Sequence, residues 1–565
     1  MFKTVGIGKQ SFESIRVNDC FYIDKTMFIK EWWEKNDDVT LITRPRRFGK
    51  TLNMDMLNCF FSNKFAERGD LFEGLEIWNY EKYRKLQGTY PVIFLSFAGV
   101  KQNNYEDTIA RIKKIVCDLY QSFIFLKDWD GLTDEERNNI KNISNDMSDV
   151  TVQSAINDLS SYLSRYYGKK AIILLDEYDT PMQEAYVNGF WDKIVSFMRS
   201  LFNTTFKTNP YIERAIMTGI TRVSKESIFS DLNNLEIVTT TSEKYTTAFG
   251  FTEDEVFWAL NEYGLLDKKL EVKEWYDGFT FGSRSDIYNP WSIINFLDKR
   301  KFDTYWADTS SNGLVNELIR TGSAEIKETM ETLMSGKVVE KNLDEQIVFE
   351  QLGKNRDAVW SLLLASGYLK IETYCEVGRL QKKVYGLKLT NFEVKRMFGF
   401  MIEQWFGGED VPYNEFVKAL LKGDIESMNI YMEKVTKNIM SYFDTGKRPS
   451  DEEPEKFYHG LVLGLMIDQI ENYIIKSNRE SGYGRYDIML EPIDKNNMKY
   501  PGIVIEFKVF NFRKEDTLKE TLSAALKQIN EKDYDTELIS RGVKKENIRH
   551  YGFAFKGKEV LIGTD

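Results

Sequence analysis

Short apolar runs alternate with longer amphipathic stretches through the first half of the chain. Strands are predicted where apolar and β-branched residues run together, at residues 38–43, 90–97, 171–175, 213–219 and 235–239. The stretches between these runs have helical periodicity, as at residues 52–61. Nearly continuous apolar strands that alternate with helices are typical of a parallel sheet covered on both faces. We therefore predict the α/β class.

The pattern becomes mainly helical from about Thr246. Residues 252–255 (TEDE) have the form of a capping box and predict a helix at 256–263. The tripeptide Asn289-Pro290-Trp291 predicts the start of a further helix. A helix, two strands and a second helix are then predicted at 360–366, 368–374, 382–389 and 392–405. That order suits a small winged-helix-like module, and it also suits a plain connector, which we favour.

The C-terminal section has a third pattern. We expect residues 409–446 to be helical and linking, and residues 455–476 to form one long amphipathic helix. Strands are predicted at 485–490 and 502–509, a helix at 516–530, and two further strands at 551–555 and 559–562. This α-β-β-α-β-β order has the size of one domain.

The composition is that of a folded protein with several domains. With 565 residues the chain is too long for one hydrophobic core, since cores stop growing at about 250–300 residues. The formal net charge of −11 excludes a globally basic nucleic-acid binder, but it leaves room for a local basic patch. No apolar run has the length of a membrane-spanning helix, so we expect no membrane partner.

The numbers and positions of cysteine and histidine exclude some kinds of metal site and catalytic site. The four cysteines are far apart in the sequence and form no metal-binding pattern. Reduced thiols in a cytoplasmic protein are the simplest account of them, and the N-terminal residues lack the apolar region of a secretory signal. His459 and His550 are the only histidines, which excludes chemistry built on several histidines.

A phosphate-binding loop is predicted between the first strand and its helix. Such a loop follows GxxxxGK[ST] in a strand–loop–helix context, and Gly49-Lys50-Thr51 supplies its second half. Backbone N–H groups at the helix start would cradle phosphate oxygens. Lys50 would reach the β- and γ-phosphates of ATP, and the Thr51 hydroxyl would hold Mg²⁺. A basic turn that only caps a helix is the alternative.

This loop departs from the pattern at Arg44, which stands where the first glycine is expected. Arginine adopts a positive φ only at a cost, and Pro45 stiffens the same turn, so we expect a variant path. Arg44, Arg46 and Arg47 are expected to add positive charge around the phosphates. Phe48 completes the expected nucleotide-binding segment before Gly49.

Two further strand ends would complete this site. The strand at 171–175 is followed by Asp176 and Glu177, at the carboxyl edge where ligands bind in α/β sheets. Asp176 is suited to Mg²⁺ through water, and Glu177 to orienting the attacking water. At the next strand end, Thr218 would sense the γ-phosphate, and Arg222 would stabilise transition-state charge within the chain or across a homo-oligomer. Ordinary solvated strand ends are the alternative.

Six short segments resemble one known family. They are YIDKT at 22–26, TRPRRFGKT at 43–51, ILLDEYDTP at 173–181, SDLNN at 230–234, FGFT at 249–252 and YNPW at 288–291. Together they are similar to the AAA-ATPase-like family of bacteria and anaerobe-associated microbes, over about residues 5–300. RPRRFGKT is the usual form of the loop in that family, so the resemblance makes Arg44 a family feature. It implies an ATPase domain followed by a helical lid.

Acidic and basic residues converge in the predicted C-terminal strands. A hairpin of the strands at 485–490 and 502–509 would bring Asp487 beside Glu506, and the two-residue period puts Glu506 and Lys508 on one face. Because such charges are costly on an apolar strand, a divalent cation held by Asp487, Glu506 and the Phe507 carbonyl would compensate them. Lys508 would orient water or stabilise the pentacovalent phosphate. A solvated edge strand with a Glu506–Lys508 ion pair is the alternative.

The D…ExK spacing and the order of the surrounding elements resemble the PD-(D/E)XK nuclease superfamily, which is often fused to the AAA-like ATPase. Gln528 and Tyr534 resemble the QxxxxxY element of its later helix. On the preceding helix, Glu455 would be a further metal-side carboxylate, whereas we expect His459 to be an ordinary hydrogen-bonded histidine. Members of the superfamily usually cut DNA, so the resemblance implies DNA as a partner.

Four domains are therefore expected. They are an AAA-like P-loop ATPase domain at 1–245, a helical lid at 246–330, a helical or winged-helix-like connector at 331–445, and a restriction-endonuclease-like PD-(D/E)XK domain at 446–565. The first hypothesis is an ATPase whose nucleotide state regulates Mg²⁺-dependent cleavage of DNA. One alternative is an ATP-dependent switch whose C-terminal domain binds a partner or nucleic acid without cutting it. Another is a front domain that binds nucleotide poorly and serves as a scaffold.

Overall fold

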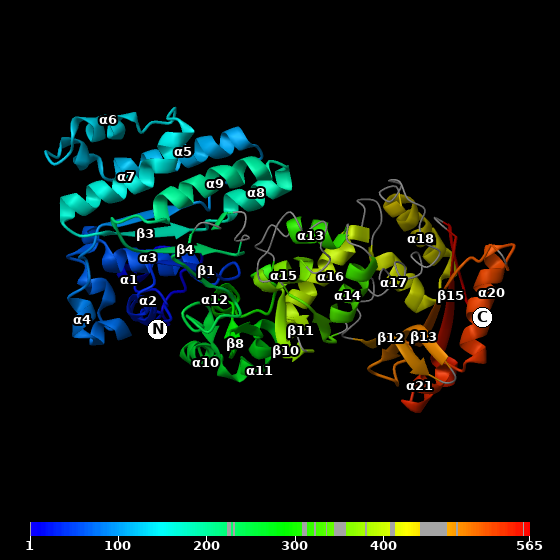
Figure 1. The fold of residues 1–565 in the computed structure, drawn as a ribbon. Helices are drawn as coiled ribbons and strands as arrows, with labels where there is room; N and C mark the ends of the chain where they lie inside the picture. The colour runs from blue at the N-terminus through cyan, green and yellow to red at the C-terminus, as the bar shows by residue number, and fades with distance from the viewer. Residues whose placement is uncertain are drawn as a thin grey trace. The chain divides into compact units, whose positions relative to one another are not determined.

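The chain folds into two compact units, Met1–Leu314 with Glu340–Val394, and Val315–Val339 with Lys395–Asp565. Figure 1 shows the elements in a computed structural model. The described residues are 2–222, 228–229, 232–307, 313–320, 324–334, 336–343, 358–378, 381–406, 413–440, 472–481, 484–512, 514–556 and 559–565.

The first unit is built on a five-stranded parallel sheet (Figure 1). Its strands are β1 (Val39–Thr43), β2 (Val92–Ser96), β3 (Ala171–Asp176), β4 (Ile212–Gly219) and β5 (Leu235–Val238). They lie in the order β2-β3-β4-β1-β5, and every pairing is parallel. The predicted parallel sheet is confirmed, with each predicted strand within two residues of its observed bounds.

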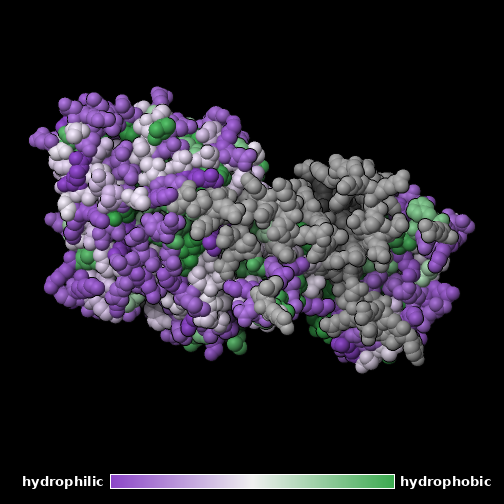
Figure 2. Space-filling view, viewed as in Figure 1, coloured by the Kyte–Doolittle hydropathy of each residue, from purple (hydrophilic) through white to green (hydrophobic). Residues whose placement is uncertain are grey.

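Helices cover both faces of this sheet (Figure 1). One side carries α5 (Tyr105–Gln121), α6 (Asp134–Asn142), α7 (Asp149–Tyr167), α8 (Thr180–Asn188) and α9 (Trp191–Phe206). The other carries α1 (Phe12–Val17), α2 (Met27–Lys35), α3 (Lys50–Phe61) and α4 (Glu81–Arg84). Every residue of β1 and β3 is buried as a result, which explains their continuous apolar sequences. The outer surface in view is mainly hydrophilic over this part of the chain (Figure 2).

A smaller group of elements follows the sheet in the same unit. It contains β6 (Phe251–Thr252), α10 (Glu253–Glu262), α11 (Lys269–Tyr276), β7 (Phe279–Phe281), β8 (Arg284–Tyr288) and α12 (Pro290–Lys299). The capping box at Thr252 and Glu255 is present at the start of α10, and Asn289 caps α12 as predicted. Apolar residues of α10, α11 and α12 share one buried core with Ile23.

The middle of the chain has the predicted order of helix, strand, strand and helix. These elements are α15 (Ala358–Ala365), β10 (Leu369–Val377), β11 (Lys382–Leu389) and α16 (Phe392–Phe406), and β10 pairs antiparallel with β11. The other described elements of this region are α13 (Gly313–Arg320), α14 (Ala324–Met334) and β9 (Val339–Lys341). Gly367 lies where a Cβ would come within 2.9 Å of Pro45, so the turn between α15 and β10 packs closely on the loop after β1 within the first unit.

The second unit contains a mixed five-stranded sheet. Its strands are β12 (Tyr473–Ser481), β13 (Gly484–Pro492), β14 (Gly502–Val509), β15 (Ile548–Lys556) and β16 (Glu559–Gly563), in that spatial order. Only the pair β14–β15 is parallel among the described pairings. The helices are α17 (Tyr413–Lys422), α18 (Ile425–Met440), α20 (Leu518–Glu531) and α21 (Asp535–Ser540). Residues of α17 and α18 pack on one face of the sheet, and residues of α20 and α21 on the other.

The predicted helix at 455–476 is wrong at its C-terminal end. Tyr473–Ser481 form strand β12, in register with β13 from Tyr473↔Pro492 onward. The β-branched pair Ile474-Ile475 favours a strand, and hydrogen bonding to β13 outweighs the helical period that continues from the preceding residues. Residues 455–471 lie outside the described part of the chain. Within that part, every helix is too short or too polar to cross a lipid bilayer.

Candidate functional sites

The loop between β1 and α3 has the backbone geometry of an anion-binding turn. Arg47 and Gly49 adopt positive φ values of 65° and 80°, as residues do in turns whose successive N–H groups bind an anion. Gly49 is the N-cap of α3, and no side chain caps this end of the helix. The N–H groups of the first turn and the positive end of the helix dipole are therefore available to an anion such as a phosphate.

Lys50 begins α3 and folds back over its own loop. Its side chain is buried, and Nζ donates hydrogen bonds to the carbonyl oxygens of Arg44 and Pro45 at 2.9 and 2.8 Å. Burial lowers the pKa of Lys50, while the negative charges of Glu177, Asp176 and Asp179 oppose that shift. The amine is thus held inside the loop, close to the acids of β3, as a phosphate-binding lysine requires.

Arg44 has a different role from the one its position suggests. Its guanidinium is fully buried and donates to the carbonyl oxygens of Thr43 and Thr239 at 2.9 and 2.7 Å. Weaker bonds reach the carbonyls of Lys244 and Tyr245, at 3.3 and 3.5 Å. Burial lowers the pKa of Arg44 to about 9. The expectation that Arg44 adds charge around the phosphates is therefore wrong, because its donors bind the backbone of residues 239–245.

The remaining loop residues divide between surface and core. Arg47 is exposed, with its guanidinium 4.3 Å from the ring centre of Trp291. Arg46 is half-buried, and its carbonyl oxygen accepts a hydrogen bond from Asn289 at 3.2 Å. Phe48 is buried, with its ring centre 4.8 Å from that of Phe279 in β7. Phe48 contributes its backbone to the loop while its side chain anchors the loop to β7.

Asp176, the last residue of β3, contacts one side chain from the start of α3 and one from the end of β4. Its Oδ2 accepts from the Thr51 hydroxyl at 2.7 Å, and its Oδ1 accepts from the Thr218 hydroxyl at 2.5 Å. This contact arises because β4 lies between β1 and β3, so the carboxyl ends of all three parallel strands share one edge. Burial raises the pKa of Asp176, and the hydroxyl hydrogen bonds and Lys50 oppose the shift. The structure therefore brings together Lys50, Thr51, Asp176 and Thr218.

Glu177 and Arg222 lie near this group but are held differently. Glu177 adopts a φ of 51°, an unfavourable conformation for a residue with a side chain, and such strain is concentrated at functional sites. Its Oε2 accepts from the Thr180 hydroxyl at 3.3 Å. Arg222 is half-buried after the end of β4. No hydrogen bond among the described residues joins Arg222 to Lys50 or Asp176.

Asp179 is an important residue that the sequence analysis missed. Its Oδ2 accepts from the backbone N–H groups of Ile220 and Thr221 at 3.0 and 2.8 Å, and from the Thr221 hydroxyl at 2.8 Å. A Cβ at Gly219 would lie 2.7 Å from Asp179 Oδ1, so glycine is required for this approach. Asp179 thus fixes the segment after β4 that positions Thr218. The available signal was a third acid, three residues after Asp176, in the segment DEYD at 176–179.

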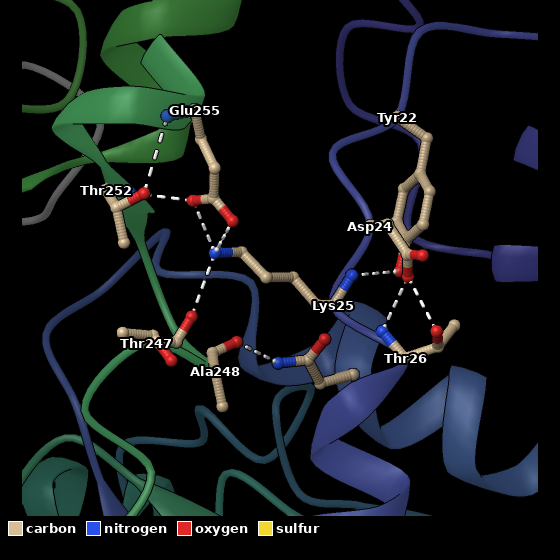
Figure 3. A network of polar contacts seen from close by, with 9 residues as sticks. Tyr22, Asp24, Lys25, Thr26, Thr247, Ala248, Thr252 and Glu255 are labelled. Atoms are coloured by element: carbon tan, nitrogen blue, oxygen red, sulfur yellow. Dashed lines mark hydrogen bonds and ion pairs between the residues drawn. The ribbon is translucent and has the colours of Figure 1, made fainter. Parts of the chain in front are cut away.

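The YIDKT segment ties the N-terminal residues to α10 (Figure 3). The buried Lys25 amine donates to both carboxylate oxygens of Glu255, at 2.7 and 2.6 Å, and to the Thr247 carbonyl at 2.8 Å. Asp24 accepts from the Thr26 N–H and hydroxyl at 2.8 and 2.7 Å, which orders the turn before α2. The side chain of Asn53, one turn into α3, donates to the Ala248 carbonyl at 2.8 Å. These contacts connect the phosphate-loop helix with the segment that leads into α10.

In the second unit, β13 and β14 form the predicted hairpin. The register Ile488↔Ile505 and Leu490↔Ile503 places Asp487 opposite Glu506 at the end of the pairing. Asp487 Oδ2 accepts a hydrogen bond from the Phe507 N–H at 2.7 Å. The carboxylate of β13 is thereby held against the backbone of β14, between Glu506 and Lys508.

Glu506 and Lys508 share the face of β14 that α20 covers. Ile505 and Phe507 point into the opposite core, whereas Val504 packs with Ile529 of α20. The Gln528 side chain bridges the charged pair: its oxygen accepts from Lys508 Nζ at 2.7 Å, and its nitrogen donates to Glu506 Oε1. The same nitrogen lies 3.1 Å from the Tyr534 hydroxyl. Burial and the negative charges of Glu506 and Asp487 raise the pKa of Tyr534.

Two parts of the sequence match known protein families. Residues 6–229 match a family described as predicted AAA-ATPase, and residues 453–565 match the PD-(D/E)XK nuclease superfamily. The chain joins an AAA-ATPase-like domain to a PD-(D/E)XK nuclease-superfamily domain. It is also 26% identical, over 404 residues, to an uncharacterized protein in the vnfD 5′ region of Azotobacter chroococcum mcd 1. That similarity covers 70% of this chain and 68% of the relative, and the predicted fusion is confirmed.

The AAA-ATPase-like domain offers a donor set that fits ATP with Mg²⁺. The uncapped start of α3 and Lys50 suit phosphate oxygens. The Thr51 hydroxyl and the buried Asp176 carboxylate, 2.7 Å apart, are the hard oxygen ligands that Mg²⁺ prefers. A cation beside Asp176 would also oppose the effect of burial, which favours the neutral carboxyl.

The PD-(D/E)XK domain likewise offers hard oxygen donors for Mg²⁺. Asp487 and Glu506 come from adjacent strands, and Glu506 is only 4% exposed. A second carboxylate next to the buried Glu506 is costly without a cation, so the pair fits a divalent metal. Glu455, the further carboxylate predicted for this site, and His459 both lie outside the described residues.

Proposed function

We propose that this protein binds and hydrolyses ATP in its AAA-ATPase-like domain and cleaves DNA with Mg²⁺ in its PD-(D/E)XK domain. One observation carries the proposal: in each domain, a lysine lies near carboxylate side chains from other elements, and hydrogen bonds hold these charged groups in place. Asp176 with Lys50 and Asp487–Glu506 with Lys508 are these two groups. The cytoplasm is the proposed compartment, supported by four free cysteines.

The AAA-ATPase-like domain would act mainly by positioning. The start of α3 and Lys50 would bind the β- and γ-phosphates, Thr51 and Asp176 would hold Mg²⁺, and Thr218 would report the γ-phosphate through its bond to Asp176. Arg46, Arg47 and Phe48 contribute the loop backbone, and Arg46 and Arg47 add charge. Glu177 would orient the attacking water, and Arg222 would stabilise charge in the transition state.

The PD-(D/E)XK domain would hydrolyse a phosphodiester bond. Asp487 and Glu506 would hold Mg²⁺, which when bound supplies positive charge to the developing phosphorane. Lys508 would hold the attacking water or stabilise the same charge. Gln528 sets the orientation of both Glu506 and Lys508, so the two catalytic groups share one support. DNA contact by a chain of net charge −11 would depend on local basic groups and weaken steeply with salt.

The nuclease proposal is tested by Mg²⁺-dependent cleavage of plasmid and single-stranded DNA. We expect Glu506→Ala to lower the cleavage rate by at least about 10²–10³-fold. Glu531→Ala is the matched control, because this acid ends α20 in an exposed ion pair. Cleavage that persists in Glu506→Ala would remove the assigned site. If neither protein cuts while ATP binding is intact, the regulatory switch replaces the nuclease.

The ATPase proposal is tested by equilibrium binding of ATP in the presence of Mg²⁺. Lys50→Ala is expected to weaken ATP binding at least tenfold, because it removes the buried cation of the loop. Lys85→Ala, a change at an exposed lysine of the same domain, serves as the control. If the wild type and Lys50→Ala bind ATP with the same affinity, the ATPase proposal fails and the AAA-ATPase-like domain serves as a scaffold.

A further inference from the structure

The face of β14 that carries Glu506 and Lys508 continues beyond the end of the strand. The Phe510 N–H donates to the Phe555 carbonyl at 2.8 Å, which extends the pairing of β14 with β15 by one residue. The two-residue period therefore places Phe510 in the same row as Glu506 and Lys508. Lys556 is the last residue of β15, next to Phe510, and its amine lies 4.4 Å from the Phe510 ring centre. An aromatic ring and a cation thus lie next to Glu506 and Lys508, the proposed catalytic residues of β14.

Phe512 stands at the outer end of this row. Its side chain is 75% exposed, the largest exposed fraction of any aromatic residue in the described part of the chain. Its ring centre is 5.0 Å from that of Phe510, in an edge-to-face arrangement, and 5.8 Å from the Lys556 amine. Phe512 is the fourth residue after Lys508, a span of at most about 14 Å. A large apolar ring is therefore exposed to solvent close to the catalytic lysine.

The carboxylate of Glu515 contacts the backbone of Asn511, the residue before Phe512. Glu515 Oε2 accepts from the Asn511 N–H at 2.8 Å and from the Thr521 hydroxyl at 2.7 Å. The Glu515 N–H in turn donates to the Asn511 carbonyl at 3.0 Å. The turn that precedes α20 is thus tied to the first turns of that helix. Phe512 thus directly follows a residue that is hydrogen-bonded to Glu515, and a backbone held in this way lowers the loss of conformational entropy when an aromatic side chain binds.

This combination fits one kind of ligand best. Proteins that bind single-stranded nucleic acid pair aromatic rings, on which bases stack, with cations that contact the phosphates. Inside a duplex each base is covered on both sides by its neighbours, so a protein ring stacks most readily on a base that is unpaired. Phe512 offers the ring, and Lys556 and Lys508 offer the cations on the same face of β14 and β15.

We propose that Phe512 is a stacking platform for an unpaired base of the DNA strand that enters the Asp487–Glu506–Lys508 site. The preferred substrate is then DNA with single-stranded bases next to the scissile phosphate, in place of fully paired duplex. This inference rests on the proposed nuclease function for its substrate. It assigns Phe512 to binding and specificity, since the ring provides no group for catalysis.

Binding of fluorescently labelled oligonucleotides, without Mg²⁺, tests the inference separately from cleavage. We expect Phe512→Ala to weaken binding of a single-stranded oligonucleotide about tenfold and binding of a blunt duplex less than about twofold. Phe512→Trp should restore the affinity, because it keeps a stacking ring. Ile493→Ala, which shortens another exposed apolar side chain of the same domain, is the control. Equal losses on both DNA forms, no loss with either, or no binding of single strands by the wild type would overturn the inference.

Oligonucleotides with a single abasic position identify the contact more closely. At the position that meets Phe512, removal of the base should weaken wild-type binding about as much as Phe512→Ala does, and Phe512→Ala should lose nothing further. The dependence of the affinity on salt should stay unchanged in Phe512→Ala, since no charge is removed. If the wild type cuts DNA but no abasic position interacts with Phe512, the nuclease function stands and this inference fails. If stacking is found without any cleavage, the inference stands as a binding function and the nuclease proposal fails.

Discussion

The two candidate sites hold their charged groups by different means. In the AAA-ATPase-like domain the partners are mainly backbone groups: Lys50 and Arg44 donate to carbonyl oxygens, and Asp179 accepts from N–H groups. In the PD-(D/E)XK domain Glu506 and Lys508 are held by a side chain, that of Gln528, while Asp487 accepts from the Phe507 N–H. Backbone partners cannot be removed by substitution, so changing the charged residue leaves buried carbonyls without donors. We therefore expect substitutions at the site of the AAA-ATPase-like domain to lower mainly the stability of the protein. Substitutions at the site of the PD-(D/E)XK domain should lower mainly its activity.

Arg44→Gly is the sharpest test of this difference. The change restores the glycine expected of the general phosphate loop, yet it removes a buried guanidinium that serves the carbonyls of Thr43, Thr239, Lys244 and Tyr245. We expect the first unit to lose about 3–5 kcal/mol of unfolding free energy, from unsatisfied carbonyls and a cavity. The measurement is the urea midpoint of that unit, followed by near-ultraviolet circular dichroism.

Arg47→Gly is the matched control for this change. It removes an exposed arginine of the same loop at a residue that already has a positive φ of 65°, where glycine is favoured. Its unfolding free energy should therefore change by less than about 1 kcal/mol. An Arg44→Gly protein as stable as the wild type would show that backbone partners do not set the stability of this site.

Gln528→Ala should separate activity from stability in the other domain. Without the amide, Lys508 and Glu506 lose the group that orients both, and we expect the Mg²⁺-dependent cleavage rate to fall about 10–100-fold. The unfolding free energy of the second unit should fall by only about 1–2 kcal/mol. Lys527→Ala, at the preceding exposed position of α20, is the control. A variant that keeps full cleavage would contradict the proposed support role of Gln528.

Much of both sites could be predicted because their residues follow local patterns. The strand ends that carry Asp176 and Thr218 follow from apolar runs, and a parallel sheet brings such ends to one edge. The face shared by Glu506 and Lys508 follows from the period of a strand, and the hairpin with Asp487 follows from its position one loop earlier. The roles assigned to these residues stay predictions until activity is measured.

Other features depend on contacts between distant residues, which no local pattern contains. The Arg44 side chain is oriented by hydrogen bonds to carbonyl oxygens of residues 239–245, which are about 200 residues away in the sequence. Asp179 is the N-cap residue of α8, but its side chain makes no capping hydrogen bond and bonds to the segment after β4. Strand β12 exists because β13 supplies its hydrogen bonds, whereas the sequence around Tyr473 continues a helical period. In each case a tertiary partner outweighs the local preference.

The pH dependence of Mg·ATP binding should expose the burial of Asp176. Burial raises the pKa of this carboxyl, so a proton competes with the metal at pH values where an exposed aspartate, with a pKa near 4, is fully ionised. We expect the affinity for Mg·ATP to keep rising with pH above the range in which an exposed aspartate titrates, until Asp176 is fully ionised. Asp176→Asn should bind more weakly and lack that part of the slope, while keeping the part due to ATP itself. Parallel slopes in the two proteins would argue against Asp176 as a metal ligand.

The smallest expected effect is that of Tyr534→Phe. The Tyr534 hydroxyl lies 3.1 Å from the Gln528 nitrogen that also donates to Glu506, so it restricts the orientation of the amide. Loss of one such hydrogen bond is expected to lower the cleavage rate about two- to fivefold, equivalent to about 0.5–1 kcal/mol. Because the hydroxyl acts through Gln528, the same change made in the Gln528→Ala protein should have no further effect. An equal loss in both backgrounds would mean that Tyr534 contacts the substrate directly and that side chains beyond Gln528 also organise this site.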